Sequence, residues 1–289
     1  MNKKALLTGS TGGLGKEIAD ILAKDGWDLV LVNRSQEKSA EQIKNLQEQY
    51  PNQNFVSFIA DLMDIEQIKK VCAEISQQHP KISALYNISG LLTDKRIDSP
   101  QGYEGHFALN SIAPYLMMKY LQPILKSENN ADNNDNNATN LSVIVNFSTE
   151  AIKSIKNIDL SALPNPEKIG GLFDAYSKTK FAMTAATNAI SEKLLADNIV
   201  AYSICPGPTK TQMTHNNSGM PFFIRLLRPL IFKPASAQAR KLVNAVNEIS
   251  KTDKTGIFIA SGKLVKNPPL TEDKDIQKNL IEMLDKIAA

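Results

Sequence analysis

The chain has 289 residues, of which 42% are hydrophobic and 22% are charged. This balance is typical of a packed soluble protein and excludes a wholly disordered or collagen-like chain. The net charge of +3 is spread along the sequence, without a dense run of Lys and Arg. We therefore expect no nucleic-acid partner.

Cysteine and histidine usage narrows the class further. The two cysteines, Cys72 and Cys205, exclude a disulfide scaffold and fit a reducing compartment. The cysteines and the three scattered histidines share no metal-ligand spacing, so no metal site is expected. No stretch resembles a secretory signal or approaches the ~20 apolar residues that span a bilayer. We expect a cytoplasmic, metal-free protein.

Short β-rich runs alternate with helical patterns, which predicts βαβ units and a parallel sheet. The predicted strands are Lys4–Thr8, Asp28–Val32, Phe55–Ile59, Ala84–Asn87, Leu141–Phe147, Ile199–Cys205 and Ile257–Ala260. The clearest helical patterns are Glu37–Gln49, Ile65–Gln77, Tyr103–Leu125, Ala175–Leu195 and Ser236–Ile249. The prediction is a single α/β domain over residues 1–289, with a doubly wound, seven-stranded parallel sheet of the Rossmann type and helices on both faces.

Two segments interrupt this alternation. Residues 129–140 contain seven asparagines and two aspartates. Because this composition cannot build a hydrophobic core, we predict a surface loop there rather than a partner site. The region 211–235 contains the run MPFFIRLLRPLIFK at Met220–Lys233. We predict a lid over an apolar site, with a membrane-surface helix and plain core as the alternatives.

A glycine-rich turn joins the first strand to the helical residues that follow it. Gly9, Gly13 and Gly15 let the backbone approach a ligand closely, and the start of a helix supplies free N–H groups. The turn therefore predicts a pyrophosphate site, the alternative being a purely structural turn.

The end of the second strand indicates which dinucleotide binds. An Asp or Glu there would bind a ribose hydroxyl, but the sequence has Asn33 and Arg34. Arg34 can hold a 2′-phosphate by charge-assisted hydrogen bonds, so NADP(H) is favoured over NAD(H). The alternative is a solvated arginine beside a helix.

Tyr176 and Lys180 are four residues apart in a predicted helix and so share one face. Lys178 is rotated by about 200° and faces elsewhere. An ammonium beside a phenol lowers the phenol's pKa from ~10, and such a tyrosine can exchange a proton with a carbonyl oxygen. The same spacing recurs at Tyr115 and Lys119, which we interpret as structural. Tyr176 differs because strands that end in Ser148-Thr149 and Pro206-Gly207 flank it, and catalytic groups gather at such strand ends.

These motifs together resemble the short-chain dehydrogenase/reductase family, over nearly the whole chain. The residues that carry the resemblance, in chain order, are Thr8–Gly15, Asp61-Leu62, Asn87-Ile88-Ser89-Gly90, Asn110, Ser148-Thr149, Tyr176/Lys180 and Pro206-Gly207. Within the family the chain is most similar to the retinol dehydrogenase-like branch. Three features indicate this: the long stretch from Thr149 to Tyr176, the run Phe232-Lys233-Pro234 and the late Thr255-Gly256-Ile257-Phe258.

The resemblance implies a role for individual residues. The implied cofactor contacts are Gly9, Ser10, Gly13, Leu14 and Gly15 at the pyrophosphate, Asp61, Leu62, Asn87 and Gly90 at the adenosine, and Pro206, Gly207, Thr209 and Thr211 at the carboxamide. Tyr176 is implied as the general acid/base, and Lys180 would hold the nicotinamide ribose. Asn110 would keep a proton-relay water in place, or else satisfy helix backbone. For Asp61 a helix-capping role near Asp64 is the alternative.

The sequence departs from the family pattern at two places. The family's Asn-Asn-Ala-Gly is Asn87-Ile88-Ser89-Gly90 here, and the substrate-orienting serine is replaced by Thr149. Threonine keeps a hydroxyl, so we assign that role to Thr149 with Ser148 as the fallback. The resemblance implies NADP(H)-dependent hydride transfer on a hydrophobic carbonyl or alcohol, retinoid- or lipid-like. A non-catalytic NADP(H)-binding regulator is the alternative. Peripheral membrane contact through residues 220–233 and a homo-oligomer are further expectations.

Overall fold

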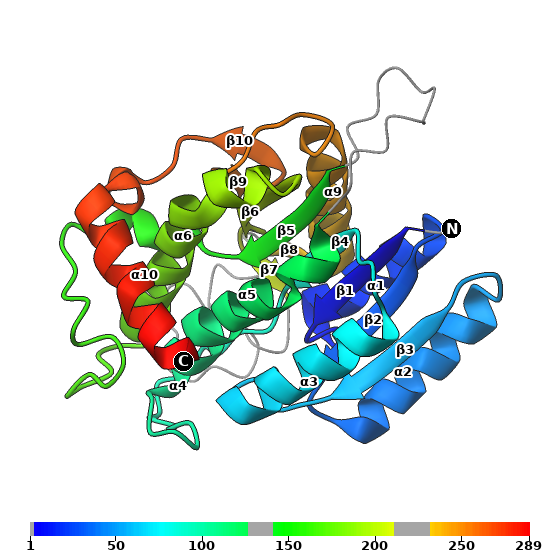
Figure 1. Ribbon diagram of the computed structural model, residues 1–289, viewed down its shortest axis with the longest axis horizontal. Coiled ribbons are helices and arrows are strands. Elements are labelled where there is room, and N and C mark those ends of the chain that lie inside the picture. Colours follow the sequence, from blue (N-terminus) through cyan, green and yellow to red (C-terminus); the bar gives the residue numbers. More distant parts are fainter. Residues whose placement is uncertain (1–2, 127–140, 211–231) are drawn as a thin grey trace.

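The computed structural model describes residues 3–126, 141–210 and 232–289 (Figure 1). The described residues contain an eight-stranded sheet in the order β10-β9-β6-β5-β4-β1-β2-β3. Its strands are β1 Lys4–Thr8, β2 Asp28–Asn33, β3 Phe55–Ile59, β4 Ala84–Asn87, β5 Ser142–Phe147, β6 Ile199–Cys205, β9 Ile257–Ala260 and β10 Lys263–Val265. The short strands β7 (Thr209–Lys210) and β8 (Lys233–Pro234) form a separate parallel pair.

The doubly wound sheet confirms the predicted fold, and every predicted strand is present within one residue at each end. The prediction was one strand short, because β10 pairs antiparallel with β9 at the edge of the sheet. Only Ser261 and Gly262 connect these two strands, with φ values of 50° and 81°. A two-residue loop with positive φ at both positions is the tight connection that joins antiparallel neighbours.

Helices cover both faces of the sheet, which explains why β2, β5 and β6 are buried along their whole length. The long helices are α1 Gly13–Lys24, α2 Gln36–Gln49, α3 Ile65–Gln78, α5 Ala113–Leu125, α6 Asp174–Leu195, α9 Ala235–Ile249 and α10 Lys274–Ala288. One apolar core packs α3, α5 and α6 against the sheet, and the other packs α1, α2 and α9. Short helical turns lie at η2 (Glu150–Ser154) and η3 (Pro269–Glu272).

The helix predicted at Tyr103–Leu125 is not continuous. It begins with α4 (Gly105–Phe107), widens into a π-helical turn, η1 (Ala108–Ile112), and continues as α5. The hydrophobic pattern does not reveal this interruption, because nearly every residue from Glu104 to Met118 is buried and no periodic face marks where the helix changes its winding. π-Helical turns occur frequently at functional sites, and this one contains Asn110.

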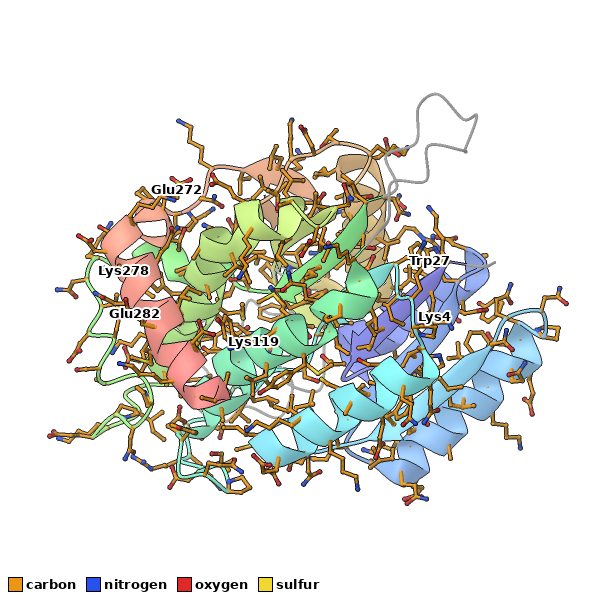
Figure 2. All side chains as sticks on the ribbon, viewed as in Figure 1. Lys4, Trp27, Lys119, Glu272, Lys278 and Glu282 are labelled. Carbon is orange, nitrogen blue, oxygen red and sulfur yellow. The ribbon has the colours of Figure 1, made fainter. Side chains whose placement is uncertain are left out.

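Helix α10 was not predicted, although Asp273 caps its first turn and Leu280 and Leu284 are fully buried four residues apart. In Figure 1 it lies along the outside of α6 and α5, and its contacts with α6 agree. Tyr115 and Lys119 of α5 both reach its Asp285, with O–O and N–O distances of 2.9 and 2.6 Å (Figure 2 labels Lys119). The second Tyr–Lys pair therefore fastens α10 to α5.

Several predictions lie outside the described residues. They are the Asn-rich loop at 129–140, most of the lid region 211–235 with its run at 220–233, and Thr211. Across residues 3–126, 141–210 and 232–289, no helix is long and apolar enough to cross a membrane.

Candidate active site

The carboxyl ends of the parallel strands meet at one edge of the sheet, as their register requires. The residues that end strands β1, β2, β4, β5 and β6 there are Thr8, Asn33, Asn87, Phe147 and Cys205. Many of the predicted site residues end these strands or lie in the segments that follow them, and Asp61 and Leu62 follow β3 in the same way. This is the edge at which ligands bind in open α/β sheets.

The glycine turn after β1 is tightly packed. Gly9 and Gly13 have φ values of 68° and 54°, which favour glycine. A Cβ atom at Gly15 would lie 2.4 Å from the carbonyl oxygen of Gly9, and one at Gly9 would lie 2.6 Å from Ser89 Oγ. No side chain caps the start of α1 at Gly12. The uncapped helix start behind a glycine turn fits the phosphates of a dinucleotide.

Ser10 and Asn33 lie side by side and are buried. Asn33 Oδ1 accepts hydrogen bonds from the Ser10 N–H at 2.9 Å and from the Ser10 hydroxyl at 3.2 Å, and Gln42 of α2 also bonds Ser10. These contacts fix the glycine turn to the end of β2. Arg34, the next residue, is exposed and has no hydrogen bond or ion pair to the described residues.

Asp61 and Leu62 follow β3. Asp61 Oδ1 accepts a hydrogen bond from the Met63 N–H at 3.0 Å and so closes a local turn. The residue that caps α3 is Asp64, whose carboxylate accepts from the Glu66 N–H at 3.0 Å. The alternative of a helix cap at Asp61 is therefore wrong. Leu62 is buried, with 6% of its side chain exposed.

Asn87 ends β4 and begins a buried polar chain that crosses to α6. Its Nδ2 donates to Asn146 Oδ1 at 2.8 Å, and Asn146 Nδ2 donates to Thr187 Oγ1 at 2.9 Å. Asn87 Oδ1 is buried without a partner in the described residues. Three residues later, Gly90 lies against the predicted catalytic groups, since a Cβ there would be 3.1 Å from Asn110 Oδ1 and 3.4 Å from Lys180 Nζ.

Lys180 is 4% exposed and points from α6 to the sheet edge. Its ammonium donates a hydrogen bond of 2.6 Å to the carbonyl oxygen of Phe147, the last residue of β5. Burial lowers the pKa of Lys180 to about 8. Lys178 behaves differently, as predicted: it is partly exposed and pairs with Asp174 at 2.9 Å. Of these two lysines, Lys180 is the one whose ammonium lies beside Gly90.

Tyr176 is half-buried on the same side of α6. Burial, and next the Cys205 sulfur at the end of β6, raise the pKa of Tyr176 above its usual value. The sequence predicted that Lys180 would lower the pKa of Tyr176. The prediction fails because the Lys180 ammonium is bound to the Phe147 carbonyl and makes no hydrogen bond with the phenol. A neutral phenol at this position carries the proton that a general acid donates.

The two hydroxyls after β5 point to different surroundings. Ser148 is buried, and its Oγ lies 2.8 Å from Thr184 Oγ1 inside α6. Thr149 is half-buried, and its Oγ1 accepts a hydrogen bond of 3.3 Å from the Ala151 N–H at the start of η2. The Thr149 hydroxyl therefore keeps its own proton free to donate.

Asn110 is fully buried in the π-helical turn. Its Oδ1 accepts from the Leu91 N–H at 2.8 Å, and its Nδ2 donates to Leu91 O at 3.0 Å and to Thr179 Oγ1 at 3.2 Å. The amide thus satisfies the loop after β4 and not helix backbone. The sequence analysis did not predict this contact with Thr179. The position of Thr179 between Tyr176 and Lys180 could have indicated that its side chain lies near the site.

Pro206 and Gly207 are clamped after β6. Gly207 has a φ of 74°, and a Cβ there would lie 2.6 Å from Ser261 Oγ. The Pro206 carbonyl accepts a hydrogen bond from Gln238 of α9, a contact that the sequence did not indicate. Thr209 donates from its hydroxyl to Gly207 O at 2.9 Å. These contacts shape the loop for which the family resemblance implies a contact with the carboxamide.

Known proteins resemble this chain in sequence. The sequence profile of the short chain dehydrogenase family matches residues 3–133 and 167–221. Retinol dehydrogenase 13 from Homo sapiens is 24% identical over 284 residues, which cover 96% of this chain and 82% of that protein.

Solved structures resemble it in fold. The NADPH-bound carbonyl reductase from chicken fatty liver matches with a TM-score of 0.66 and 19% identity, over 92% of this chain and 99% of that one. The 3-ketoacyl-(acyl-carrier-protein) reductase from Brucella melitensis, complexed with NADH, also gives a TM-score of 0.66 and 19% identity, over 89% and 96% of the two chains. At these identities the structural matches support the fold alone.

Proposed function

We propose that this chain, which belongs to the short chain dehydrogenase family, interconverts hydrophobic carbonyl compounds and alcohols with NADP(H). As a member of that family it is an oxidoreductase that transfers hydride with a nicotinamide cofactor. The observation that carries the proposal is that three predicted catalytic residues lie in one place. Asn110 and Lys180 both lie beside Gly90, and Tyr176 is one helical turn from Lys180 on α6.

The preference for NADP(H) rests on the end of β2. Arg34 is exposed beside the glycine turn, and the strand ends in Asn33, whose amide oxygen accepts hydrogen bonds from Ser10. The one carboxylate on β2 is Asp28, at the opposite end of the strand from Arg34. No carboxylate at the end of β2 therefore repels a 2′-phosphate. The solved relatives leave the choice open, since one is described with NADPH and another with NADH.

The residues of the site divide the reaction between them. When bound, the nicotinamide would supply or accept the hydride. Tyr176, whose pKa burial raises further above neutral pH, donates its proton to the carbonyl oxygen, and Thr149 orients that oxygen through its hydroxyl. The Lys180 ammonium stabilises the phenolate that forms. Alcohol oxidation uses the same groups in reverse.

The proposed substrate class is apolar, with a retinoid- or lipid-like aldehyde, ketone or alcohol as the best candidates. Two observations support it: the sequence run Met220–Lys233, rich in Phe, Leu and Ile, and the similarity to a protein named retinol dehydrogenase 13. A lid formed by 211–235 and membrane contact by 220–233 are part of this proposal. Sedimentation with liposomes tests the membrane contact, because a chain that stays in the supernatant contradicts it.

The test of the proposed function is turnover of NADPH and NADH with a series of aldehydes of increasing chain length. We expect NADPH to be the better cofactor and kcat/KM to rise with chain length. Small polar carbonyls that outperform the long apolar ones would contradict the substrate class. Tight NADPH binding without oxidation by any carbonyl would favour the non-catalytic regulator instead.

A further inference from the structure

The segment Ile88–Thr93, which leaves β4 and passes the active site, is held by side chains from other elements. Three side chains accept hydrogen bonds from its backbone N–H groups. Thr8 at the end of β1 accepts from Ile88 and Ser89, Asn110 of η1 accepts from Leu91, and His106 of α4 accepts from Thr93. Thr8 and Asn110 belong to the regions already assigned to the site. His106 has no role in the reaction proposed above.

His106 is completely buried, and so is its neighbour Glu104, with 0% and 1% of the side chains exposed. Glu104 Oε1 lies 2.8 Å from His106 Nδ1. Because a carboxylate can only accept, the hydrogen of a neutral imidazole is on Nδ1 and the lone pair is on Nε2. The Thr93 N–H donates to that lone pair at 3.2 Å.

Glu104 is held in its charged form by the same region of chain. Its Oε2 accepts from the N–H groups of His106 at 3.0 Å and Phe107 at 3.3 Å, where it caps α4. Burial opposes ionisation, but the hydrogen bonds from His106 and Phe107 hold the pKa of Glu104 below its usual value. The carboxylate therefore keeps the imidazole in one orientation and one tautomer.

The position of the anchored segment matters because it contacts the catalytic groups directly. Gly90 lies three residues before Thr93, and its Cα faces Lys180 Nζ and Asn110 Oδ1 so closely that a methyl group would come within 3.4 and 3.1 Å of them. Ser89 lies still closer to Gly9 of the glycine turn, since a methyl group on Gly9 would come within 2.6 Å of Ser89 Oγ. A segment that moved would shift both the lysine and the turn.

We propose that His106 is a positioning residue of the active site, which fixes Ile88–Thr93 against Lys180 and Asn110 through the Thr93 N–H. This inference rests on the proposed function. Removal of His106 Nε2 as an acceptor leaves the Thr93 N–H without its partner. Of the three side chains that hold Ile88–Thr93, only Thr8 and Asn110 then remain. Misplacement of catalytic groups by about 1 Å lowers turnover strongly.

The test compares His106→Leu, which removes the acceptor, with His106→Gln, whose amide can accept from Thr93 and donate to Glu104. We expect His106→Leu to lower kcat/KM roughly 10-fold and to speed amide hydrogen exchange in residues 88–93. His106→Gln should restore both to within about 3-fold of the wild-type protein. Unchanged kinetics in His106→Leu, or no rescue by His106→Gln, would overturn the proposal.

Two further variants separate positioning from stability. His79→Leu is the matched control, because His79 bonds Lys4 at the amino end of β1, away from the carboxyl edge (Figure 2 labels Lys4), and its kinetics should equal those of the wild-type protein. If His106→Leu does not fold, Glu104→Gln replaces it. The amide that Glu104→Gln introduces can donate to Nδ1, which leaves a hydrogen on Nε2 facing the Thr93 N–H, so the same loss is expected.

A failure of the proposed function gives a different result from a failure of this inference. If none of the carbonyl compounds causes the wild-type protein to oxidise NADPH, the catalytic proposal fails. The affinity for NADPH, measured by fluorescence titration, then replaces kcat/KM. A wild-type affinity in His106→Leu, with unchanged exchange in residues 88–93, would contradict the positioning role independently of any turnover.

Discussion

The ammonium nitrogen of Lys180 lies 2.6 Å from the carbonyl oxygen of Phe147, so a helix side chain closes the end of the central strand β5. Burial of this ammonium lowers the pKa of Lys180 to about 8. The cation is therefore present below that pH and is lost above it. In the proposed reaction this cation would stabilise the Tyr176 phenolate, so we predict that kcat/KM for carbonyl reduction falls as the pH rises through about 8.

A pH profile of kcat/KM from pH 6 to roughly 10 checks this prediction, because kcat/KM reports the groups of the free enzyme. Lys180→Arg is the control, since a guanidinium stays charged throughout that range. Whatever activity the arginine variant retains should lack the decline near pH 8. A wild-type profile that is flat across the whole range would contradict the assignment of Lys180.

Arg34 should determine the choice between the two dinucleotides. We predict that Arg34→Ala lowers kcat/KM with NADPH by about 10- to 100-fold and leaves kcat/KM with NADH nearly unchanged, because a charge-assisted hydrogen bond to a phosphate is lost. The matched control is Arg240→Ala, which removes a surface ion pair between α9 and Asp25. Equal losses with both cofactors in Arg34→Ala would mean that Arg34 does not contact the 2′-phosphate.

The two hydroxyls after β5 can be separated by substitution. Thr149→Val keeps the shape of the side chain but removes its donor, and we predict a loss of roughly 100-fold in kcat, which Thr149→Ser should largely restore. Ser148→Ala should instead cost about 1 kcal/mol of stability, through the hydrogen bond to Thr184. Steady-state kinetics and urea denaturation distinguish them. The reverse pattern would assign the substrate contact to Ser148.

The second Tyr–Lys pair should matter for stability alone. Tyr115 donates to Asp285 of α10 at 2.9 Å, and burial, with Asp285 next, raises the pKa of Tyr115 above its usual value. We predict that Tyr115→Phe lowers the free energy of unfolding by about 1 kcal/mol and leaves kcat within about 2-fold. Denaturant unfolding and initial rates measure the two effects. A large loss of kcat would show that the spacing alone does not distinguish the catalytic pair.

The sheet was predictable from sequence because its strands are short apolar runs, covered on both faces and separated by helical patterns. The missing elements are those with weaker or different signals. β10 is an exposed three-residue edge strand, and its turn depends on the positive φ of Ser261 and Gly262. The π-helical turn at Asn110 lies in a segment that is buried on nearly all sides, so the hydrophobic pattern has no periodicity that could reveal it.

The site was predictable where function depends on residue type and spacing, and less so where it depends on tertiary contacts. Tyr176 and Lys180 are defined by spacing, but the partner of Lys180 is a backbone carbonyl, which no side-chain pattern encodes. The expected decrease in the pKa of Tyr176 assumed a direct contact with that ammonium. Burial of the phenol, and next the Cys205 sulfur, instead raise the pKa of Tyr176.

The central claim is that the Tyr176 phenol transfers the proton while neighbouring residues hold the dinucleotide. The most direct test measures NADPH oxidation and NADPH binding in Tyr176→Phe, with Tyr115→Phe as the matched control. We predict that Tyr176→Phe binds NADPH within about 3-fold of the wild-type protein and loses at least ~100-fold in kcat, while Tyr115→Phe keeps both. Turnover by Tyr176→Phe at the wild-type rate would contradict the account.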